Sequence, residues 1–455
     1  MPDAIRVFAE HASRTRFEDL PEAAVSAARI FILDTIGVGL AGSNGPRLAE
    51  LIQSSAAMLG DGPARCWGHR RTLSAPGAAM INGYQIHNSE FDCVHEAAVI
   101  HPVTVCLAAV MAHADRVGGV SGRDLVTAVV LGVDTACHLG VASTTGLRFF
   151  RPATAGIFAA AAGLGKVLGF DANRQLALFG HVYGQLCGTM QPHQEGSMLL
   201  GLQIGFNARN AVIAADLAQR GIPSIEHILE GPFGYFGMIE ASGDLSGVLG
   251  AIGKVWRITE VAHKPFPSGR ATHGMLDGLL ELKAQHGFAA AEVERAEARV
   301  PPLTHQLVGR PPIDSMAVNY ARLCGSYVSA CALINGELGS DDFKDAQRHD
   351  PKRLALARRI AVVVDGNPDA NALTPVTVTV RLKDGREFAR TIDTVYGNPK
   401  KPMSREAHLG KFRRNFESAL NPLPRQNGER LVAMLDDIEH LDDVRRIGEL
   451  LVPAA

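Results

Sequence analysis

The order of apolar and polar positions predicts helices over the first part of the chain. Segment 20–42 has Pro21 where a first helical turn tolerates proline, a glycine-rich end, and a second half that is apolar on every side. A helix that is apolar all round is a buried helix. Segment 121–143 opens with the capping-box spacing of Ser121 and Asp124, and apolar residues then recur at helical spacing. Both segments are therefore predicted to be core helices.

Two further segments, 152–170 and 207–221, are rich in alanine and glycine. Small side chains let helices approach one another closely, and protein interiors are packed to a high density. We therefore predict a tightly packed helical core rather than a bundle with solvated spaces.

The pattern changes near residue 264, where strand-like segments begin to alternate with helical ones. In segment 375–395, valines alternate with threonines before an Asp-Gly pair at 384–385, which predicts a tight turn into a second strand. The other strand-like segments are 293–301 and 358–365, and the helical ones are 272–287 and 320–338. This part of the chain is predicted to form an α+β domain.

Helical patterns return after a proline-rich exit at 397–404. Helices are predicted over 404–420 and 428–451, and we expect them to pack back on the first domain. The predicted fold is mainly α, with a large all-helical domain built from both chain ends and a smaller α+β domain. The predicted boundaries are 1–263 with 403–455 for the first and 264–402 for the second. An active site is expected between the two domains.

The charge balance argues against several classes of partner. The 455 residues include 45 Lys and Arg against 47 Asp and Glu, a formal net charge of −2. This balance gives no electrostatic footprint for nucleic acid or an anionic membrane. The N-terminus has charges every few residues and no secretory apolar region, and no apolar run reaches the roughly 18 residues of a spanning helix. A soluble, cytoplasmic protein is expected.

The cysteines indicate a reducing compartment. The seven cysteines are scattered, and none forms a C-x-x-C pair. This pattern argues against a disulfide framework, a zinc ribbon and an iron–sulfur cluster. No metal site is predicted from them.

The stretch 87–102, HNSEFDCVHEAAVIHP, gathers titratable side chains in an otherwise apolar region. They are His87, Glu90, Asp92, His95, Glu96 and His101. The histidines are eight and six residues apart, so no two share a helical face as in a H-E-x-x-H metal site. A polar loop whose histidines bond to backbone is one interpretation. Carboxylates and imidazoles packed together just before Pro102 favour acid–base chemistry instead.

Two other polar segments carry candidate chemistry. MQPHQEGSM, residues 190–198, contains His193 and Glu195 between apolar, glycine-rich segments. HKPFPSGRATH, residues 263–273, contains Lys264, Ser268, Arg270 and His273. Lysine and arginine bind carboxylates, and arginine can do so with two parallel hydrogen bonds. An interdomain hinge explains segment 263–273 equally well. If the polar segments are instead unrelated loops, we expect them to lie far apart in the structure.

An ordered set of segments resembles the MmgE/PrpD family, which includes 2-methylcitrate dehydratase, cis-aconitate decarboxylase and iminodisuccinate epimerase. They are INGYQIHNSEFD…HPV (81–103), GVSGRDLVTAVVLGVD (119–134), FNARNAVIAADLAQRGI (206–222), HKPFPSGRATHGMLDGL (263–279) and SYVSACALINGEL (326–338). The resemblance implies a large all-helical domain from both chain ends, an α+β lid domain and a homodimer. It also implies chemistry without metal or organic cofactor, in which a base removes a proton next to a carboxylate held by cations.

The resemblance also maps site residues onto the chain. The positions that match are Asp92, His101, Lys264, His273 and Tyr327. Four positions depart from the family pattern: Glu90 stands for an aspartate, Cys93 for a carboxylate, Arg151 for the histidine of a His-Pro pair, and Leu200 for a lysine. His193 and Glu195 are the candidates to replace that lysine.

From these residues we expect a cofactor-independent lyase, a hydratase or dehydratase similar to 2-methylcitrate dehydratase, acting on a small hydroxy di- or tricarboxylate. His101 is expected to be the acid–base group, oriented by Asp92 or Glu90, with Tyr327 donating to a leaving oxygen. The expected substrate-binding residues are Lys264, Arg151, His273, His193, Arg270 and Ser268. An epimerase or racemase, a decarboxylase of the same family, and a non-catalytic metabolite-binding paralogue are the alternatives.

Overall fold

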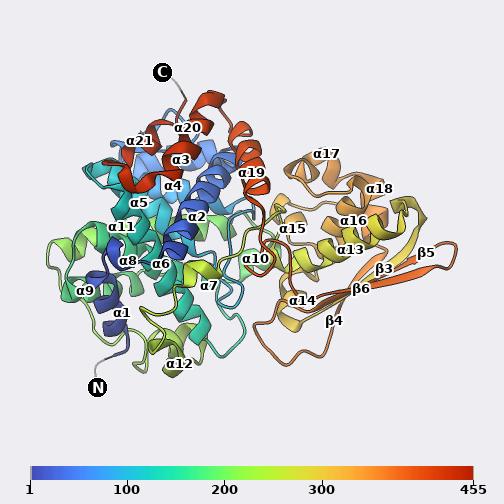
Figure 1. Ribbon diagram of the computed structural model, residues 1–455, viewed down its shortest axis with the longest axis horizontal. Helices are drawn as coiled ribbons and strands as arrows, with labels where there is room; N and C mark the ends of the chain where they lie inside the picture. The colour runs from blue at the N-terminus through green and yellow to red at the C-terminus, as the bar shows by residue number, and fades with distance from the viewer. Residues whose placement is uncertain (1–2, 454–455) are drawn as a thin grey trace. The chain divides into compact units, whose positions relative to one another are not determined.

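The computed structural model describes residues 3–453 and divides the chain into two compact units (Figure 1). We call them the helical unit and the mixed unit. The helical unit combines the described residues up to Met190 with Leu199–Val261 and the chain from Ser404 onward. The mixed unit consists of Gln191–Met198 and Ala262–Met403.

The helical unit is built almost entirely of α-helices, and the predicted mainly α fold is confirmed. Its helices are α1 Ile5–Arg14, α2 Glu22–Ala41, α3 Leu48–Leu59, α4 Ala75–His87, α5 Pro102–Val117, α6 Gly122–Ala142, α7 Arg151–Thr154, α8 Gly156–Val167, α9 Ala172–Tyr183, α11 Leu199–Gln219, α12 Ser246–Leu249, α19 Arg405–Glu417, α20 Arg425–Asp436 and α21 Arg445–Glu449. Two short antiparallel strands, β1 Ala64–Arg65 and β2 Thr72–Leu73, were not predicted.

The predicted helix starts and close contacts are present. At the start of α6, the Ser121 hydroxyl accepts a hydrogen bond from the Asp124 amide at 3.2 Å, and the Asp124 carboxylate accepts one from the Ser121 amide at 3.2 Å. Helices α4 and α11 pack so closely that a Cβ added at Gly205 would lie 2.3 Å from the Met80 carbonyl oxygen. The packing of α4 against α11 therefore requires glycine there.

Both chain ends contribute to the helical unit. Helix α19 packs against α2 and α20, beside helices from the start of the chain (Figure 1). Their junction contains a buried ion pair in which Lys411 Nζ lies 2.8 Å from Asp34 Oδ1. The C-terminal segment is thus part of the core of this unit.

The mixed unit contains a four-stranded sheet with the order β4-β3-β5-β6. The strands are β3 Val293–Val300, β4 Ile360–Val364, β5 Val376–Leu382 and β6 Glu387–Ile392, with β3–β4 parallel and the other pairs antiparallel. The alternating valines of β5 are buried against α13 His273–His286, and α16 Gly325–Asn335 contacts β4. The other helices are α10 Gln191–Glu195, α14 Pro302–Val308, α15 Val318–Arg322, α17 Asp345–Arg348 and α18 Pro351–Ala357.

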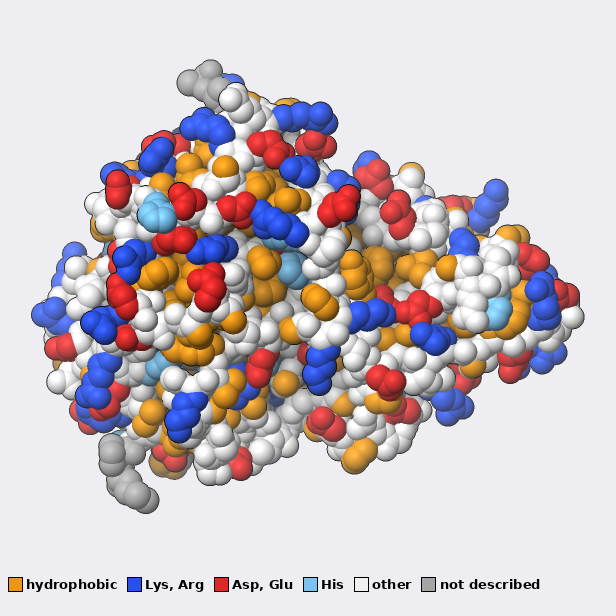
Figure 2. Space-filling view, in the orientation of Figure 1, with side chains coloured by type: hydrophobic (Ala, Val, Ile, Leu, Met, Phe, Trp, Pro, Cys, Tyr) orange, Lys and Arg blue, Asp and Glu red, His pale blue; other side chains and the backbone are white. Residues whose placement is uncertain are grey.

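Two helical segments have the length and hydropathy of a membrane span, Glu22–Asn44 and Gly122–Ala142. Their most apolar windows are 72% and 94% buried inside the fold, so both segments serve as core helices of the helical unit. On the face drawn in Figure 2, basic and acidic side chains are interspersed, in keeping with the net charge of −2. The surface drawn there thus shows the mixed charge expected from the composition.

Candidate active site

The polar stretch 87–102 forms a buried loop between two helices of the helical unit. His87 is the last residue of α4, and His101 directly precedes α5, where Pro102 is the first helical residue. An isolated bridge between His95 and Ile100 closes a short hairpin just before His101, with N–O distances of 2.8 and 3.3 Å. The two helix ends and this hairpin bring the titratable side chains together.

The Asp92 carboxylate is the centre of the cluster. It is buried, and its Oδ2 lies 2.9 Å from His87 Nδ1 and 2.7 Å from the Thr104 hydroxyl. Its Oδ1 lies 3.4 Å from His101 Nδ1. The His87 and His101 rings meet edge to face, with centroids 4.8 Å apart. Two imidazoles and a hydroxyl therefore share one carboxylate away from solvent.

The neighbours of His101 determine which ring nitrogen holds its proton. Nδ1 lies 2.9 Å from the Cys93 carbonyl oxygen, which can only accept a hydrogen bond. Nδ1 therefore carries a hydrogen, and in the neutral ring Nε2 is the basic atom. The Asp92 carboxylate on the Nδ1 side stabilises the ring when Nε2 is protonated, as a base-orienting carboxylate does.

Of the two carboxylates expected to orient His101, Asp92 contacts it and Glu90 faces His87. Glu90 Oε1 is 3.6 Å from His87 Nε2. Glu90 adopts φ +53, a left-handed conformation that non-glycine residues rarely take, and such strain is often found at functional sites.

The thiol of Cys93, next to Asp92 in the sequence, has a raised pKa. Burial is the main cause, and the charges of Asp34 and Asp92 add to it. Cys93 therefore stays a neutral thiol.

Three groups in this cluster are close enough to hold a metal ion. The ligand atoms of His87, Asp92 and His101 lie within 4.8 Å of one another. Both imidazoles, however, use Nδ1 as a hydrogen-bond donor, His87 to Asp92 and His101 to the Cys93 carbonyl. A metal ion bound at Nδ1 would displace that hydrogen, whereas a metal ion bound at Nε2 would leave it in place. The hydrogen bonds therefore argue only against ligation through Nδ1 of either ring.

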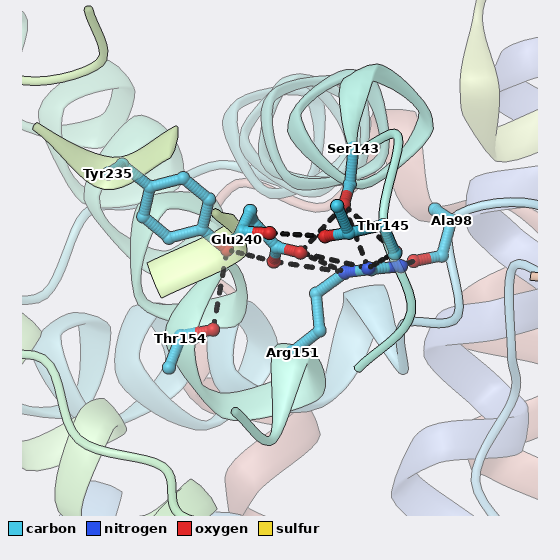
Figure 3. Close-up of polar contacts among 7 residues, drawn as sticks. All are labelled: Ala98, Ser143, Thr145, Arg151, Thr154, Tyr235 and Glu240. Carbon is cyan, nitrogen blue, oxygen red and sulfur yellow. Dashed lines mark hydrogen bonds and ion pairs between the residues drawn. The ribbon is translucent and has the colours of Figure 1, made fainter. Parts of the chain in front are cut away.

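Arg151, which was expected among the substrate contacts, is surrounded by buried protein groups. Figure 3 shows its guanidinium between Glu240 and the Ala98 carbonyl. Nη2 donates to Glu240 Oε2 at 2.8 Å, Nε to Oε1 at 3.0 Å, and Nη1 to the Ala98 oxygen at 3.1 Å. The protein itself supplies the carboxylate that Arg151 binds.

The segment 263–273 forms a compact network within the mixed unit. Arg270 Nη1 donates to the Tyr396 carbonyl at 2.8 Å and lies 3.3 Å from His273 Nδ1. Because arginine only donates, His273 Nδ1 is the acceptor, and Nε2–H faces the Ser268 carbonyl at 3.3 Å. The Ser268 hydroxyl lies 2.8 Å from that of Thr272, and Lys264 is buried. Arg270, His273 and Ser268 therefore lie together in one hydrogen-bonded network.

Two other predicted residues have partners elsewhere in the mixed unit. His193 Nδ1 accepts a hydrogen bond from Arg310 at 3.0 Å. The Tyr327 hydroxyl donates to the Asp342 carbonyl at 2.7 Å, and burial raises its pKa. Without substrate, the hydroxyl proton of Tyr327 is thus directed at a backbone carbonyl of the same unit.

Sequence reasoning missed several groups that complete these networks. His87 was recognised as titratable but given no role, and helical periodicity alone does not show that it ends α4 against Asp92. The Cys93 carbonyl is a backbone group with no sequence signal. Glu240 lies 89 residues from Arg151, and no local pattern links the two. Thr104 could have been identified from the sequence, because it lies three positions after His101 in the first turn of the helix that begins at Pro102.

Comparison with known proteins identifies the family. The family model of the MmgE/PrpD N-terminal domain matches residues 6–246, and that of the C-terminal domain matches residues 266–437. The chain belongs to the MmgE/PrpD family. The predicted resemblance is confirmed over most of the chain.

Members of this family from animals and fungi are similar to the chain over nearly its full length. Cis-aconitate decarboxylase of Mus musculus is 26% identical, covering 95% of this chain and 90% of the mouse protein. Cis-aconitate decarboxylase of Homo sapiens is 26% identical, with 95% and 91% covered, and that of Aspergillus terreus is 24% identical, with 97% and 94% covered. Family and relatives together indicate a lyase-type enzyme.

Proposed function

We propose that this MmgE/PrpD protein is a cofactor-independent lyase that moves a proton next to a carboxylate of a small di- or tricarboxylate. The observation that carries the proposal is the buried pair of His101 and Asp92, with His101 Nδ1 2.9 Å from the Cys93 carbonyl and 3.4 Å from Asp92 Oδ1. This arrangement makes Nε2 of His101 the atom that gains and loses the proton.

Decarboxylation is the reaction that we favour, because it needs a single proton donor. The bond to the departing carboxylate breaks, CO₂ leaves, and the electron pair moves through the adjacent C=C bond. The carbon that receives the pair takes the Nε2 proton of the His101 imidazolium, which water then restores. The names of the relatives, cis-aconitate decarboxylases, support an unsaturated tricarboxylate as substrate.

Dehydration, the reaction first expected, needs a second acid at the leaving hydroxyl. Tyr327 was the candidate for this role, and its proton is donated to the Asp342 carbonyl. This contact is the observation that favours decarboxylation over dehydration. Epimerisation would need a second base on the opposite face of the substrate.

Cations of the mixed unit are the proposed carboxylate-binding groups. Lys264 matches the family position and is buried, and Arg270 lies in the same network as His273 and Ser268. Buried cations bind carboxylates strongly because water does not screen the charges. We propose that Lys264 and Arg270 take the role first assigned also to Arg151, and that the protein acts as a homodimer, as the family resemblance implies.

The test is a substrate screen of the purified protein in D₂O, with cis-aconitate and hydroxy and unsaturated di- and tricarboxylates. The expected result is CO₂ release together with one deuterium on carbon of the product. A new C=C absorbance without CO₂ would show a dehydratase, and deuterium in recovered substrate without product would show an epimerase. Ligand binding across the panel without turnover would contradict the enzyme proposal and show a metabolite-binding protein.

A further inference from the structure

The hairpin that leads into His101 is held by charged side chains from distant parts of the helical unit. At one end His95 Nε2 lies 2.9 Å from Glu260 Oε2, while His95 Nδ1 accepts from the Ala98 amide at 3.1 Å. At its turn, the Ala98 carbonyl accepts from Arg151 at 3.1 Å. Val99 has φ +54, a conformation that a β-branched residue adopts only when its surroundings impose it.

The Arg151 guanidinium is itself fixed by a set of buried groups. Glu240 takes two of its nitrogens, and the Ser143 hydroxyl lies 3.0 Å from Nη2. Ser143 donates in turn to Glu240 at 2.7 Å, and the Tyr235 hydroxyl donates to Glu240 at 3.0 Å (Figure 3). Each group in this cage has defined partners, so the direction of Nη1 toward the hairpin is fixed as well.

The burial of both charges shows what the pair can bind. Arg151 and Glu240 are buried, and their opposite charges neutralise each other. A guanidinium that already has a bidentate carboxylate partner offers a second carboxylate little net attraction. The pair is therefore suited to holding backbone in place.

We propose that Arg151 and Glu240 form a positioning unit that fixes the Ala98 carbonyl, and through the hairpin 95–100 the orientation of His101. The proposal rests on His101 being the acid–base group. Arg151 acts through the hairpin on His101 and does not bind the substrate carboxylate. Displacing an acid–base group by about 1 Å can lower the rate on the order of 100-fold, so a positioning pair affects turnover rather than binding.

Steady-state kinetics of four variants tests this proposal. Arg151→Met, Glu240→Gln and the double variant are each expected to lower kcat by about 10- to 100-fold with KM within about threefold, and the double variant to be no worse than the poorer single one. Arg151→Lys keeps the charge but cannot reach both Glu240 and Ala98, so its kcat is expected to stay low. A substrate clamp gives the opposite result: KM rises in Arg151→Met, Arg151→Lys restores it, and Glu240→Gln changes neither constant.

Arg65→Met is the matched control, because Arg65 pairs with the buried Asp115 in the same unit. It is expected to lower the melting temperature as the Arg151 variants do, with kcat unchanged. An equal loss of kcat in Arg65→Met would overturn the proposal, because general destabilisation would then explain the effect. If Arg151→Met does not fold, Glu240→Gln and the double variant still carry the test.

A measurement without substrate separates this proposal from the proposed reaction. Hydrogen exchange of the amides in residues 95–101 is expected to speed up in Glu240→Gln and not in Arg65→Met. Unchanged exchange in both variants would overturn the positioning role even if His101 proves essential. If His101→Gln is inactive but Arg151→Met and Glu240→Gln keep the kcat of the wild type, this proposal alone is overturned. Full turnover by His101→Gln would instead overturn the proposed reaction.

Discussion

His101 and Asp92 show how a few side chains define a chemical state at the scale of single residues. The carbonyl of Cys93 can only accept, so it selects the Nδ1–H form of His101, and Asp92 favours the protonated ring. Both residues could be selected as candidates from the sequence, because several titratable residues lie close together in 87–102. The tautomer could not be predicted, because it depends on a backbone oxygen whose direction only the folded loop determines.

Asp92→Asn tests this pairing, since the change keeps the shape but removes the charge. The amide cannot stabilise the imidazolium, and its NH₂ group competes with the His101 and His87 donors. We expect kcat to fall by roughly 100-fold or more. Steady-state kinetics measures this, and Thr104→Val, which removes another partner of the same carboxylate, is the control with a smaller expected loss.

Glu260 gives a pH-dependent prediction at the same scale. The hydrogen bond from His95 is the main cause that lowers the pKa of this carboxyl, from 4.5 to about 2. Because the folded-state pKa is depressed, the stabilisation is fully present above about pH 4.5 and is lost as the pH falls toward 2.

The measurement is the free energy of unfolding of the wild type and of Glu260→Gln over this pH range. The wild type is expected to be the more stable at neutral pH, and the difference is expected to shrink as the pH falls through the interval. A difference that stays constant with pH would contradict the assigned cause.

Helices α4 and α11 show how close packing positions the site at the scale of elements. Helix α4 ends in His87, so its placement against α11 sets where that imidazole lies. The alanine- and glycine-rich composition predicted tight packing, and the structure confirms it. Which helices pair could not be predicted, because many small-residue faces would fit one another equally well. The pairing of α7 with Glu240 through Arg151 was missed because the two residues are 89 positions apart and no local pattern links them.

Gly205→Ala is expected to disturb this contact. Its Cβ would lie 2.3 Å from the Met80 carbonyl oxygen, which is backbone and cannot move aside without shifting α4. Overpacking of this kind costs about 1–3 kcal/mol, which chemical denaturation would detect. Gly247→Ala in α12 is the control, because nothing lies within 4 Å of the added Cβ. A neutral Gly205→Ala would contradict the close approach.

At the scale of the whole molecule, the mainly α fold with a smaller mixed part could be predicted, because the period of the hydrophobic residues changes along the chain. The alternating valines of β5 and the turn at Gly385 were predicted and are present. The contact of α19 with α2 was expected only as a general return of the tail. Its particular partner pair, Lys411 and Asp34, could not be predicted because the two residues are 377 positions apart.

Lys411→Met tests how this pair holds the chain ends together. Lys411 is buried, binds Asp34, and donates to the Phe91 carbonyl at 2.9 Å, directly before Asp92. Removing one member of a buried pair leaves an uncompensated charge, at an expected loss of about 3–5 kcal/mol. The double variant Lys411→Met/Asp34→Leu is expected to recover much of that stability in urea unfolding. A single variant as stable as the wild type would contradict the structural role.

The most direct measurement for the proposed function is the turnover of His101→Gln with the substrate found in the screen. The glutamine side chain can still form hydrogen bonds, but it cannot gain or lose a proton near neutral pH. We expect kcat to fall by about 100-fold or more, while the dissociation constant of the substrate changes little and the melting temperature stays near that of the wild type. Turnover within about threefold of the wild type would contradict the assignment of His101 as the group that moves the proton.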